Sequence, residues 1–519
     1  MKAAVSIGNH PLSTGLIDQL LAKGYHVDVF QAFEEVGDVS GYSEFCILPD
    51  CHISDENTLQ VLERLACSLP ASDPATPKPK CHLLLHSRTS LWLLQTLELF
   101  MEIPKKFELN AFTMEDLWAK NVFCQPAGIQ PPFPHLDREK IDFQSDKTVH
   151  LVIQGLSEMG ESLAYHAALT AHYPNYERNH ALRTRITIID EDITKSRNTF
   201  IQRYKALFDH SYHRTIDLSS RNITHYHEPI YKSSREDFVD IEWEFVNGGI
   251  DHPVIQQKLA LWANDEHQLL TIALCDSQCQ NNFDNAFALP DEIYSNSIPV
   301  LVHVKQAVFL EKVHETKNYS NLFPFGMENC GYDIDLPLLQ MAKRLNYCYA
   351  YSYSHSGTPT HLPTEEVEKE WNKLTSFPMQ CSNIYNVMAL ATKMRSLGHL
   401  DNDWNQLYAL SQEEIEQISA VEHNRWCVDR LLLGFRPPTD EERREIKENI
   451  DAFILAQKTG TASPEADLKA EYKRKKIHYD LCSYRELRED KTGKNVRVYD
   501  NDLNACIPLI AQSFNESRS

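Results

Sequence analysis

The sequence has few basic residues for the number of its acidic ones, and this deficit restricts its partners. It contains 51 lysines and arginines against 73 aspartates and glutamates, a formal net charge of −22 at pH 7. An excess of negative charge repels nucleic-acid backbones and anionic membrane surfaces. We therefore expect no nucleic-acid partner.

Long apolar runs are also lacking. No stretch approaches the ~18–20 apolar residues that cross a bilayer. Met1 leads directly into a strand pattern instead of a signal peptide. We expect a cytoplasmic protein that does not insert into a membrane.

Paired metal-binding motifs are missing. The chain has 13 cysteines but no C-x-x-C pair, and the spacings Cys46 to Cys51 and Cys275 to Cys279 do not fit a zinc knuckle. Histidines at positions 210, 213, 225 and 227 have no partner cluster at a fixed spacing. The sequence therefore predicts reduced thiols and no metal site.

Common hydrolase signatures are absent as well. The sequence contains no G-x-S-x-G elbow, no P-loop and no H-E-x-x-H motif. Nothing marks a general acid–base pair. We assign no catalytic residue and favour a role other than catalysis.

The most informative stretch runs from Val149 to Asp192. An apolar strand meets the turn Gly155-Leu-Ser-Glu-Met-Gly160, a helical pattern follows, and a second apolar run ends in Asp190-Glu191-Asp192. Strand, glycine turn, helix, strand and acid is the order of a mononucleotide-binding βαβ unit. The sequence predicts such a unit here.

Each residue type in this stretch suits a nucleotide. Gly155 allows the tight turn, Gly160 lets the helix pack close to the strand, and the helix N-terminus attracts phosphate. The motif departs from the usual pattern at Ser157, which replaces a glycine, and in the long spacing to the acid. The predicted site for NAD or an adenine nucleotide comprises Gly155, Leu156, Ser157, Glu158, Met159, Gly160, Asp190, Glu191 and Asp276.

Asp276 belongs to this set because it follows a later apolar strand, Leu269 to Leu274. The carboxyl ends of parallel strands form the ligand-binding edge of open α/β sheets. Asp276 can face a ribose or base there, or it can cap the next helix. The sequence leaves both roles open.

The chain length corresponds to about three domains. We expect an α/β protein with two tandem, doubly wound Rossmann-like domains followed by a mainly helical domain. In the first, Gly8 and Gly15 are too far apart for a fingerprint, and Gln31 replaces the ribose acid. The helices include a single one over Cys381 to Leu397. The predicted divisions are 1–125, a linker at 126–147, 148–325, a helical connector at 326–400 and a final domain at 401–519.

Two patches stand out in the final domain, Glu422-His-Asn-Arg-Trp426 with Gly434-Phe-Arg-Pro-Pro438, and Lys476 to Tyr484. Aromatic rings can stack on a base while cations meet phosphates. Alternatively the aromatic residues form a small core and the histidines make structural hydrogen bonds. The candidate ligand residues are His423, Trp426, Arg430, Phe435, Arg436, Lys476, His478 and Tyr484.

These two patches resemble the RyR domain, a small helical module found in ryanodine receptors and in bacterial proteins. The stretches HLVIQGLSEMGESLA, ITIIDED and LLTIALCDS resemble TrkA-N (RCK-type) nucleotide-binding domains. The combination is similar to bacterial proteins regarded as nucleotide sensors. It implies a regulatory protein that binds a small nucleotide-type ligand, with a second ligand or a partner at the RyR-like domain.

Two alternatives remain open at this point. One is a cytosolic NAD-binding subunit that regulates a potassium transporter, which needs a membrane partner. The other is an NAD-dependent oxidoreductase, which needs a proton donor over the nicotinamide. TrkA-N-like domains tend to pair, so a homodimer is a further expectation, although the tandem domains can pair within one chain.

Overall fold

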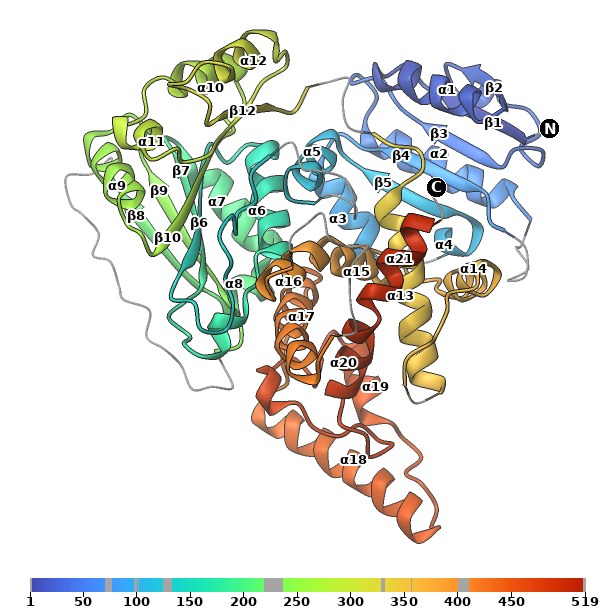
Figure 1. Ribbon diagram of the computed structural model, residues 1–519. Coiled ribbons are helices and arrows are strands. Elements are labelled where there is room, and N and C mark those ends of the chain that lie inside the picture. The colour runs from blue at the N-terminus through green and yellow to red at the C-terminus, as the bar shows by residue number, and fades with distance from the viewer. Residues whose placement is uncertain are drawn as a thin grey trace.

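Two α/β parts and a helical region make up the chain (Figure 1). The structure is a computed structural model that describes residues 2–70, 77–97, 100, 102–124, 133–218, 237–327, 332–355, 357–399 and 410–516. The expected fold class is confirmed: two parallel sheets interleaved with helices precede a mainly helical region. The histidines at positions 225 and 227 lie outside the described residues.

The first part is built on a parallel sheet, here called sheet A. Its strand order is β2-β1-β3-β4-β5, which is the flavodoxin-like order with its topological switch point between β1 and β3. The strands are β1 (Lys2–Ile7), β2 (Tyr25–Phe30), β3 (Glu44–Ile47), β4 (Lys80–Leu84) and β5 (Glu108–Phe112). The helices are α1 (Leu12–Ala22), α2 (Asp55–Ser68), α3 (Arg88–Thr96), α4 (Ile103–Lys106) and α5 (Met114–Phe123).

The second part is built on sheet B, with the order β12-β11-β10-β6-β7-β9-β8. Without the edge strand β8 this is the Rossmann order, and the switch point lies between β6 and β10. The strands are β6 (Thr148–Gln154), β7 (Thr184–Asp190), β8 (Tyr212–Asp217), β9 (Ile241–Asn247), β10 (Gln268–Leu274), β11 (Val300–His303) and β12 (Leu322–Phe325). The helices are α6 (Glu158–Thr170), α7 (Ile193–Arg203), α8 (Lys205–His210), α9 (Pro253–Ala263), α10 (Cys279–Asn285), α11 (Asp291–Ser295) and α12 (Val308–His314).

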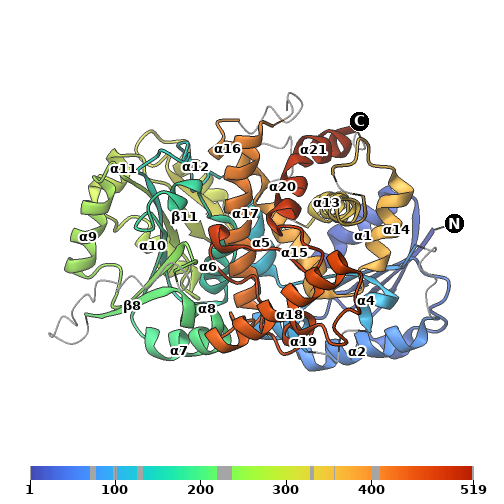
Figure 2. The same cartoon turned by 90° about the horizontal axis from the view of Figure 1, so that it is seen from below.

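The helical region lies between and below the two sheets, and α17 runs along its side that faces the second part (Figures 1 and 2). Its helices are α13 (Pro337–Ser354), α14 (Thr364–Lys373), α15 (Phe377–Met388), α16 (Leu390–Ser396), α17 (Gln412–Leu432), α18 (Asp440–Thr459), α19 (Leu468–Arg474), α20 (Arg497–Ala505) and α21 (Ile507–Glu516). No helix of the described residues is long and apolar enough to cross a membrane.

The prediction of a single helix over Cys381 to Leu397 is wrong. The chain forms two helices, α15 and α16, that meet at Ala389. The N–H of Ala389 is shared between the carbonyls of Tyr385 at 3.3 Å and Asn386 at 3.1 Å. This local tightening ends one α-helix and starts the next, and the apolar pattern alone does not reveal it.

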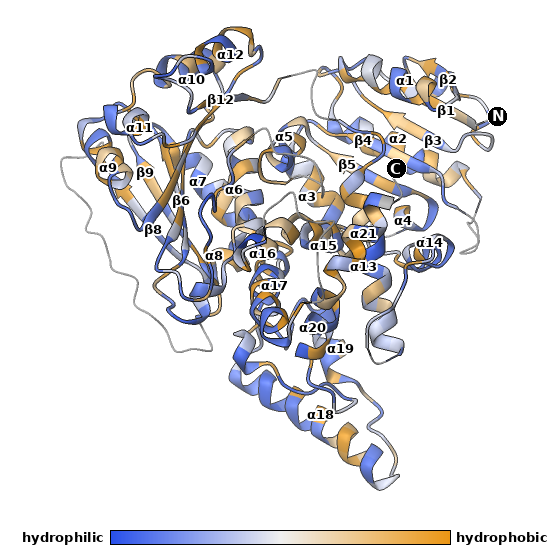
Figure 3. Cartoon of the chain, viewed as in Figure 1, coloured by the Kyte–Doolittle hydropathy of each residue, from blue (hydrophilic) through white to orange (hydrophobic). Residues whose placement is uncertain are grey.

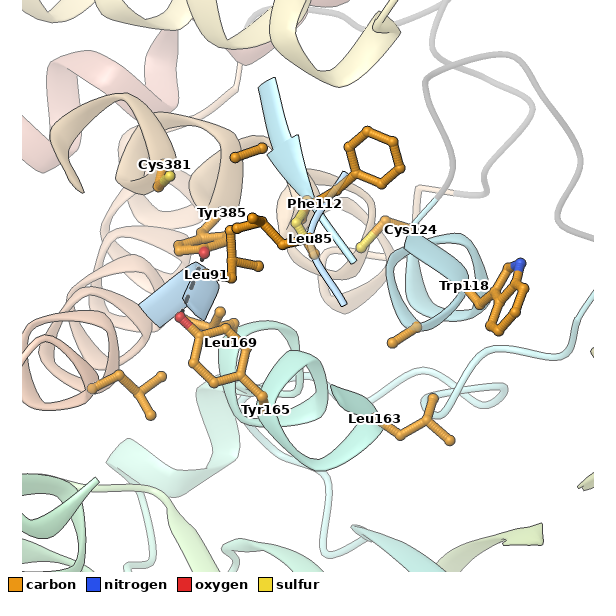
Figure 4. Close-up of a cluster of buried hydrophobic side chains, with 14 of the residues drawn as sticks. Leu85, Leu91, Phe112, Trp118, Cys124, Leu163, Tyr165, Leu169, Cys381 and Tyr385 are labelled. Atoms are coloured by element: carbon orange, nitrogen blue, oxygen red, sulfur yellow. Dashed lines mark hydrogen bonds between the residues drawn. The ribbon is translucent and has the colours of Figure 1, made fainter. Parts of the chain in front are cut away.

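Helix α6 lies at the centre of the molecule. Every residue from Met159 to Thr170 is buried, whereas α18 at the outside is mostly hydrophilic (Figure 3). One continuous apolar core includes Phe112 of sheet A, Leu163 of α6 and Tyr385 of α15 (Figure 4). Apolar and polar residues of α6 are buried alike, so protein surrounds this helix on every side. The three parts therefore share one core around α6.

The glycine at the start of α6 gives a test of this close packing. A methyl group at Gly160 would lie 2.0 Å from the carbonyl oxygen of Gly155. Gly160→Ala should therefore lower the unfolding free energy by about 1–3 kcal/mol, the usual cost of overpacking. Urea denaturation followed by circular dichroism measures the change.

The matched control is Gly15→Ala in α1. A methyl group at Gly15 meets no atom within 4 Å, and alanine favours a helix over glycine by about 0.5–1 kcal/mol. This variant should be slightly more stable than the parent. Equal effects of the two substitutions would contradict the packing described for Gly160.

Candidate functional site

The turn between β6 and α6, residues 155–160, is here called the glycine loop. Gly155 has a φ of +89°, and a methyl group there would lie 2.8 Å from the backbone nitrogen of Asp276. Its N–H donates to the carbonyl of Ile189 at 2.8 Å. Only glycine combines this backbone conformation with such close neighbours. The loop thus lies between the ends of β7 and β10, at the switch point of sheet B.

Ser157 links the two sides of the switch point. It is the N-cap of α6, and its hydroxyl accepts the Gly160 N–H at 3.3 Å. The same hydroxyl donates to the carbonyl of Cys275 at 2.5 Å, after β10. Ser157, which replaces the middle glycine of the usual dinucleotide-binding motif, therefore connects the glycine loop to the end of the neighbouring strand by a hydrogen bond.

Asp190 ends β7 beside the glycine loop, where the sequence places it. One of its carboxylate oxygens accepts the Leu156 N–H at 2.8 Å, and the other accepts the Asp192 N–H at 3.0 Å. A carboxylate has about four acceptor positions, so two remain for hydroxyl groups of a ribose. Glu191 is exposed next to it.

Asp276 forms a local turn. Its carboxylate accepts the Gln278 N–H at 2.7 Å. The buried Asn282, which sequence analysis missed, bonds both backbone groups of Asp276 and also reaches the carbonyl of His303 at 3.1 Å. These contacts fix the loop after β10 beside Gly155 of the glycine loop. Asp276 does not cap the next helix, because the N-cap of α10 is Gln278 and no side chain of the described residues caps that end.

Carboxylates crowd the N-terminus of α6. Glu158 and Glu161 lie in its first turn, Glu161 is paired with Arg203, and Glu158 accepts the backbone N–H of Arg88 at 3.3 Å. Glu158 remains exposed to solvent, but partial desolvation by the surrounding protein, followed by the charge of Glu161, raises its pKa. The positive end of a helix dipole, at the N-terminus, attracts anions. At α6 the carboxylates of the protein itself already occupy this position. A pyrophosphate placed at this end of α6 would meet the carboxylate of Glu158, whereas the charge of Glu161 is balanced by Arg203.

Gln154 is a further residue that sequence analysis missed. It is the last residue of β6 and is 8% exposed. Among the described residues no donor reaches its side-chain oxygen. Buried acceptors normally have a donor, so this oxygen is a position for a ligand N–H or O–H group. No local sequence signal marks it, because glutamine at a strand end is common.

The body of α6 joins the three parts of the molecule. The buried guanidinium of Arg88, from α3, lies 2.8 Å from Asp116 of α5 and 3.6 Å from the ring centroid of Tyr165 of α6. His166 contacts Asp116 at 2.7 Å, and Tyr165 donates to Tyr385 of α15 at 3.4 Å (Figure 4).

Neighbouring groups set the ionisation of Asp116 and His166 at this junction. Burial by itself raises the pKa of Asp116, but Lys120 and His166 outweigh it and hold that pKa well below its ordinary value. Burial lowers the pKa of His166 to about 4, so the ring is neutral at pH 7 and donates to Asp116. A displacement of α6 would disturb this network directly.

The second predicted site is partly assembled by α17. Trp426 stacks on His423 with ring centroids 5.6 Å apart and meets the edge of His478 at 4.8 Å. Tyr484 lies 5.9 Å from His423, and the guanidinium of Arg430 lies about equally far from Trp426 and Phe435. Six of the eight predicted residues therefore meet in what is here called the Trp426 cluster: His423, Trp426, Arg430, Phe435, His478 and Tyr484.

The other two predicted residues have partners elsewhere. Arg436 forms a bidentate ion pair with Glu442 at 2.7 and 2.8 Å. Lys476 donates to the carbonyl of Leu433 at 3.0 Å and so caps the C-terminus of α17. Their side chains serve the local fold rather than the Trp426 cluster.

A buried ion network supports α17 on its other side. Lys393 of α16 lies 2.7 Å from Glu422, and Arg425 lies 2.8 Å from the same carboxylate. Burial raises the pKa of Glu422, but Arg425 and Lys393 lower it to about 2. Buried charges persist when they are paired in this way. The network fixes the rotation of α17 and hence the position of Trp426.

No model of a known protein family matches the chain, and no curated protein matches it.

The Trp426 cluster predicts a specific acid sensitivity. Burial lowers the pKa of His478 to about 3, while an unfolded histidine has a pKa of about 6.5. The unfolded chain therefore binds more protons below pH 6.5, and stability falls as pH drops from 6.5 toward 3, by about 1.4 kcal/mol per pH unit for each such proton. His478→Gln should flatten this slope in urea midpoints measured from pH 7 to pH 4.5.

The control for this measurement is His26→Gln on β2, whose side chain is 64% exposed. It should leave the slope of the parent unchanged. Parallel slopes for the parent and His478→Gln would show that His478 is not held neutral by its burial.

Proposed function

We propose that this chain is a regulatory protein that senses a nucleoside-type ligand at the glycine loop. The observation that carries the proposal is the position of α6. Its N-terminus belongs to the glycine loop, and its body is buried among all three parts of the molecule.

Ligand binding at the glycine loop acts on α6 through a short path. Residues 155–160 hold the first turn of α6, and Tyr165 and His166 lie within the next two turns. Those two residues contact Tyr385 of the helical region and Asp116 of α5. If α6 has two positions, a ligand that binds one of them more tightly shifts the equilibrium toward that position. The size of the shift is set by the difference between the ligand's affinities for the two positions, and the neighbours of α6 follow it.

The local chemistry defines the ligand. Asp190 accepts the hydroxyl groups of a ribose, and Gln154 accepts a donor such as an amino group. Glu158 opposes phosphate at the N-terminus of α6, where Glu161 is paired with Arg203. Of NAD and the adenine nucleotides, the compounds with the fewest phosphates therefore fit best, and adenosine is the first ligand to test.

The resemblances agree with this proposal. The resemblance to TrkA-N domains implies a nucleotide at the same loop, and the resemblance to the RyR domain implies a second ligand or a partner at the Trp426 cluster. Arg430 supports a ligand there, since among the described residues no acceptor forms a hydrogen bond with its buried Nε. An NAD-dependent oxidoreductase is disfavoured, because it needs a pyrophosphate where the acids of α6 lie.

Isothermal titration of the full chain with adenosine, AMP and NAD tests the site. Asp190→Asn should weaken adenosine binding about tenfold to a hundredfold, because a hydrogen bond to a charged group contributes about 1.5–3 kcal/mol. The matched control is Asp192→Asn, an exposed acid two residues away, which should bind as the parent does.

Charge at the helix N-terminus is tested with Glu158→Gln. This variant should bind NAD more tightly than the parent and adenosine equally well, because only NAD carries a pyrophosphate. Failure of all three compounds to bind, or equal binding by the parent and Asp190→Asn, would remove the support for a nucleoside site at sheet B.

A further inference from the structure

Sheet A has its own group of potential metal ligands, in the loop that follows β3. Among the described residues, Asp50, Cys51 and His52 bring a carboxylate oxygen, a thiol sulfur and an imidazole nitrogen within 4.8 Å of one another. The three donors differ in type and are adjacent in sequence. This is why the cysteine spacings, which test only for paired cysteines, gave no indication of them.

The distance between the Asp50 and Cys51 donors matches that of a tetrahedral site, and the His52 nitrogen lies slightly further away. Cys51 Sγ lies 3.3 Å from Asp50 Oδ1, and His52 Nε2 lies 3.9 Å from the same oxygen. With zinc bonds of about 2.3 Å to sulfur and about 2.0–2.2 Å to nitrogen and oxygen, neighbouring ligand atoms of a tetrahedron lie about 3.3–3.6 Å apart. Asp50 and Cys51 are already at this spacing, and the exposed imidazole of His52 has to move closer to share one ion with them.

Hydrogen bonds from its own turn and from two neighbouring loops hold the loop that carries these donors. Its own turn closes with the Ile53 N–H bonded to the carbonyl of Asp50 at 2.9 Å. His86, after β4, contacts the same carbonyl at 3.1 Å. From the β1 side, the His10 N–H donates to the carbonyl of Leu48 at 3.2 Å, just before the loop. Metal binding to such a loop costs little ordering of the backbone.

The place of the loop also points to a ligand. It follows β3, the strand next to β1, and the switch point of this strand order lies between these two strands. At that edge Gly8 has a φ of +102°, and a methyl group there would lie 2.2 Å from the carbonyl oxygen of Leu48. The loops after β1 and β3 thus meet closely beside the three donors.

We propose that Asp50, Cys51 and His52 bind a divalent transition-metal ion of the zinc class at the carboxyl edge of sheet A. Three protein ligands leave the fourth tetrahedral position open to water or to a small ligand, as in catalytic and exchangeable zinc sites. On binding, the sulfur–hydrogen bond of Cys51 gives way to a sulfur–metal bond, and the proton passes to solvent. This site is independent of the nucleoside site at sheet B.

Cobalt(II) is the probe for the test, because a thiolate ligand gives it a charge-transfer absorption band in the near ultraviolet. The full chain, kept reduced with a phosphine, is titrated with cobalt chloride. The parent should show the charge-transfer band and the intense visible bands of tetrahedral cobalt. Added zinc should abolish both.

Two variants and one control assign the ligands. Cys51→Ser should lose the charge-transfer band, and His52→Asn should keep it while cobalt affinity falls at least about tenfold. Cys67→Ser is the matched control, since Cys67 is another exposed cysteine, on α2. It should titrate as the parent does. No charge-transfer band in the parent, or an unchanged band in Cys51→Ser, would overturn the proposal.

Discussion

The arrangement of the three parts depends on the buried guanidinium of Arg88. It comes from α3 of the first part, pairs with Asp116 of α5 and covers the ring of Tyr165 on α6 of the second part. A buried charge is tolerated only when it is paired, and removal of one partner costs about 3–5 kcal/mol. Arg88 therefore keeps α3, α5 and α6 in fixed positions relative to one another. The helical region is connected to α6 by the hydrogen bond between Tyr165 and Tyr385.

This constraint explains why α6 lacks a solvent-facing side. In most α/β proteins the helices of a sheet present one polar face to water. Here the residues of α6 from Met159 to Thr170 are buried, because α5, α15 and α17 pack around them. A helix in this position transmits any displacement of its N-terminus to both neighbouring parts. The first turn of α6 itself carries Glu158 and Glu161 beside the glycine loop, and their carboxylates lower the preference of this loop for phosphate.

Local sequence patterns predicted the features that depend on local geometry. The glycine loop was predicted because Gly155 and Gly160 meet steric demands within one turn. The Trp426 cluster was partly predicted because His423, Trp426 and Arg430 are spaced three or four residues apart on one helix. The edge strand β8 was missed, because its sequence YHRTID lacks a long apolar run.

Features formed by distant segments were not accessible to this reasoning. Arg88 and Tyr165 are 77 positions apart in the sequence, and Lys393 meets Glu422 from another helix. Arg436 and Lys476 look like phosphate ligands in the sequence. In the fold, Glu442 and the end of α17 engage them. Pairing of this kind is decided by tertiary packing, which the order of residue types does not reveal.

The central claim is that α6 couples the glycine loop to its neighbours, and amide hydrogen exchange of the full chain with and without adenosine tests it most directly. The account predicts slower exchange at residues 155–170 together with a change in α5 and α15, because both helices contact α6. A change confined to the glycine loop, with α5 and α15 unaffected, would contradict coupling through α6.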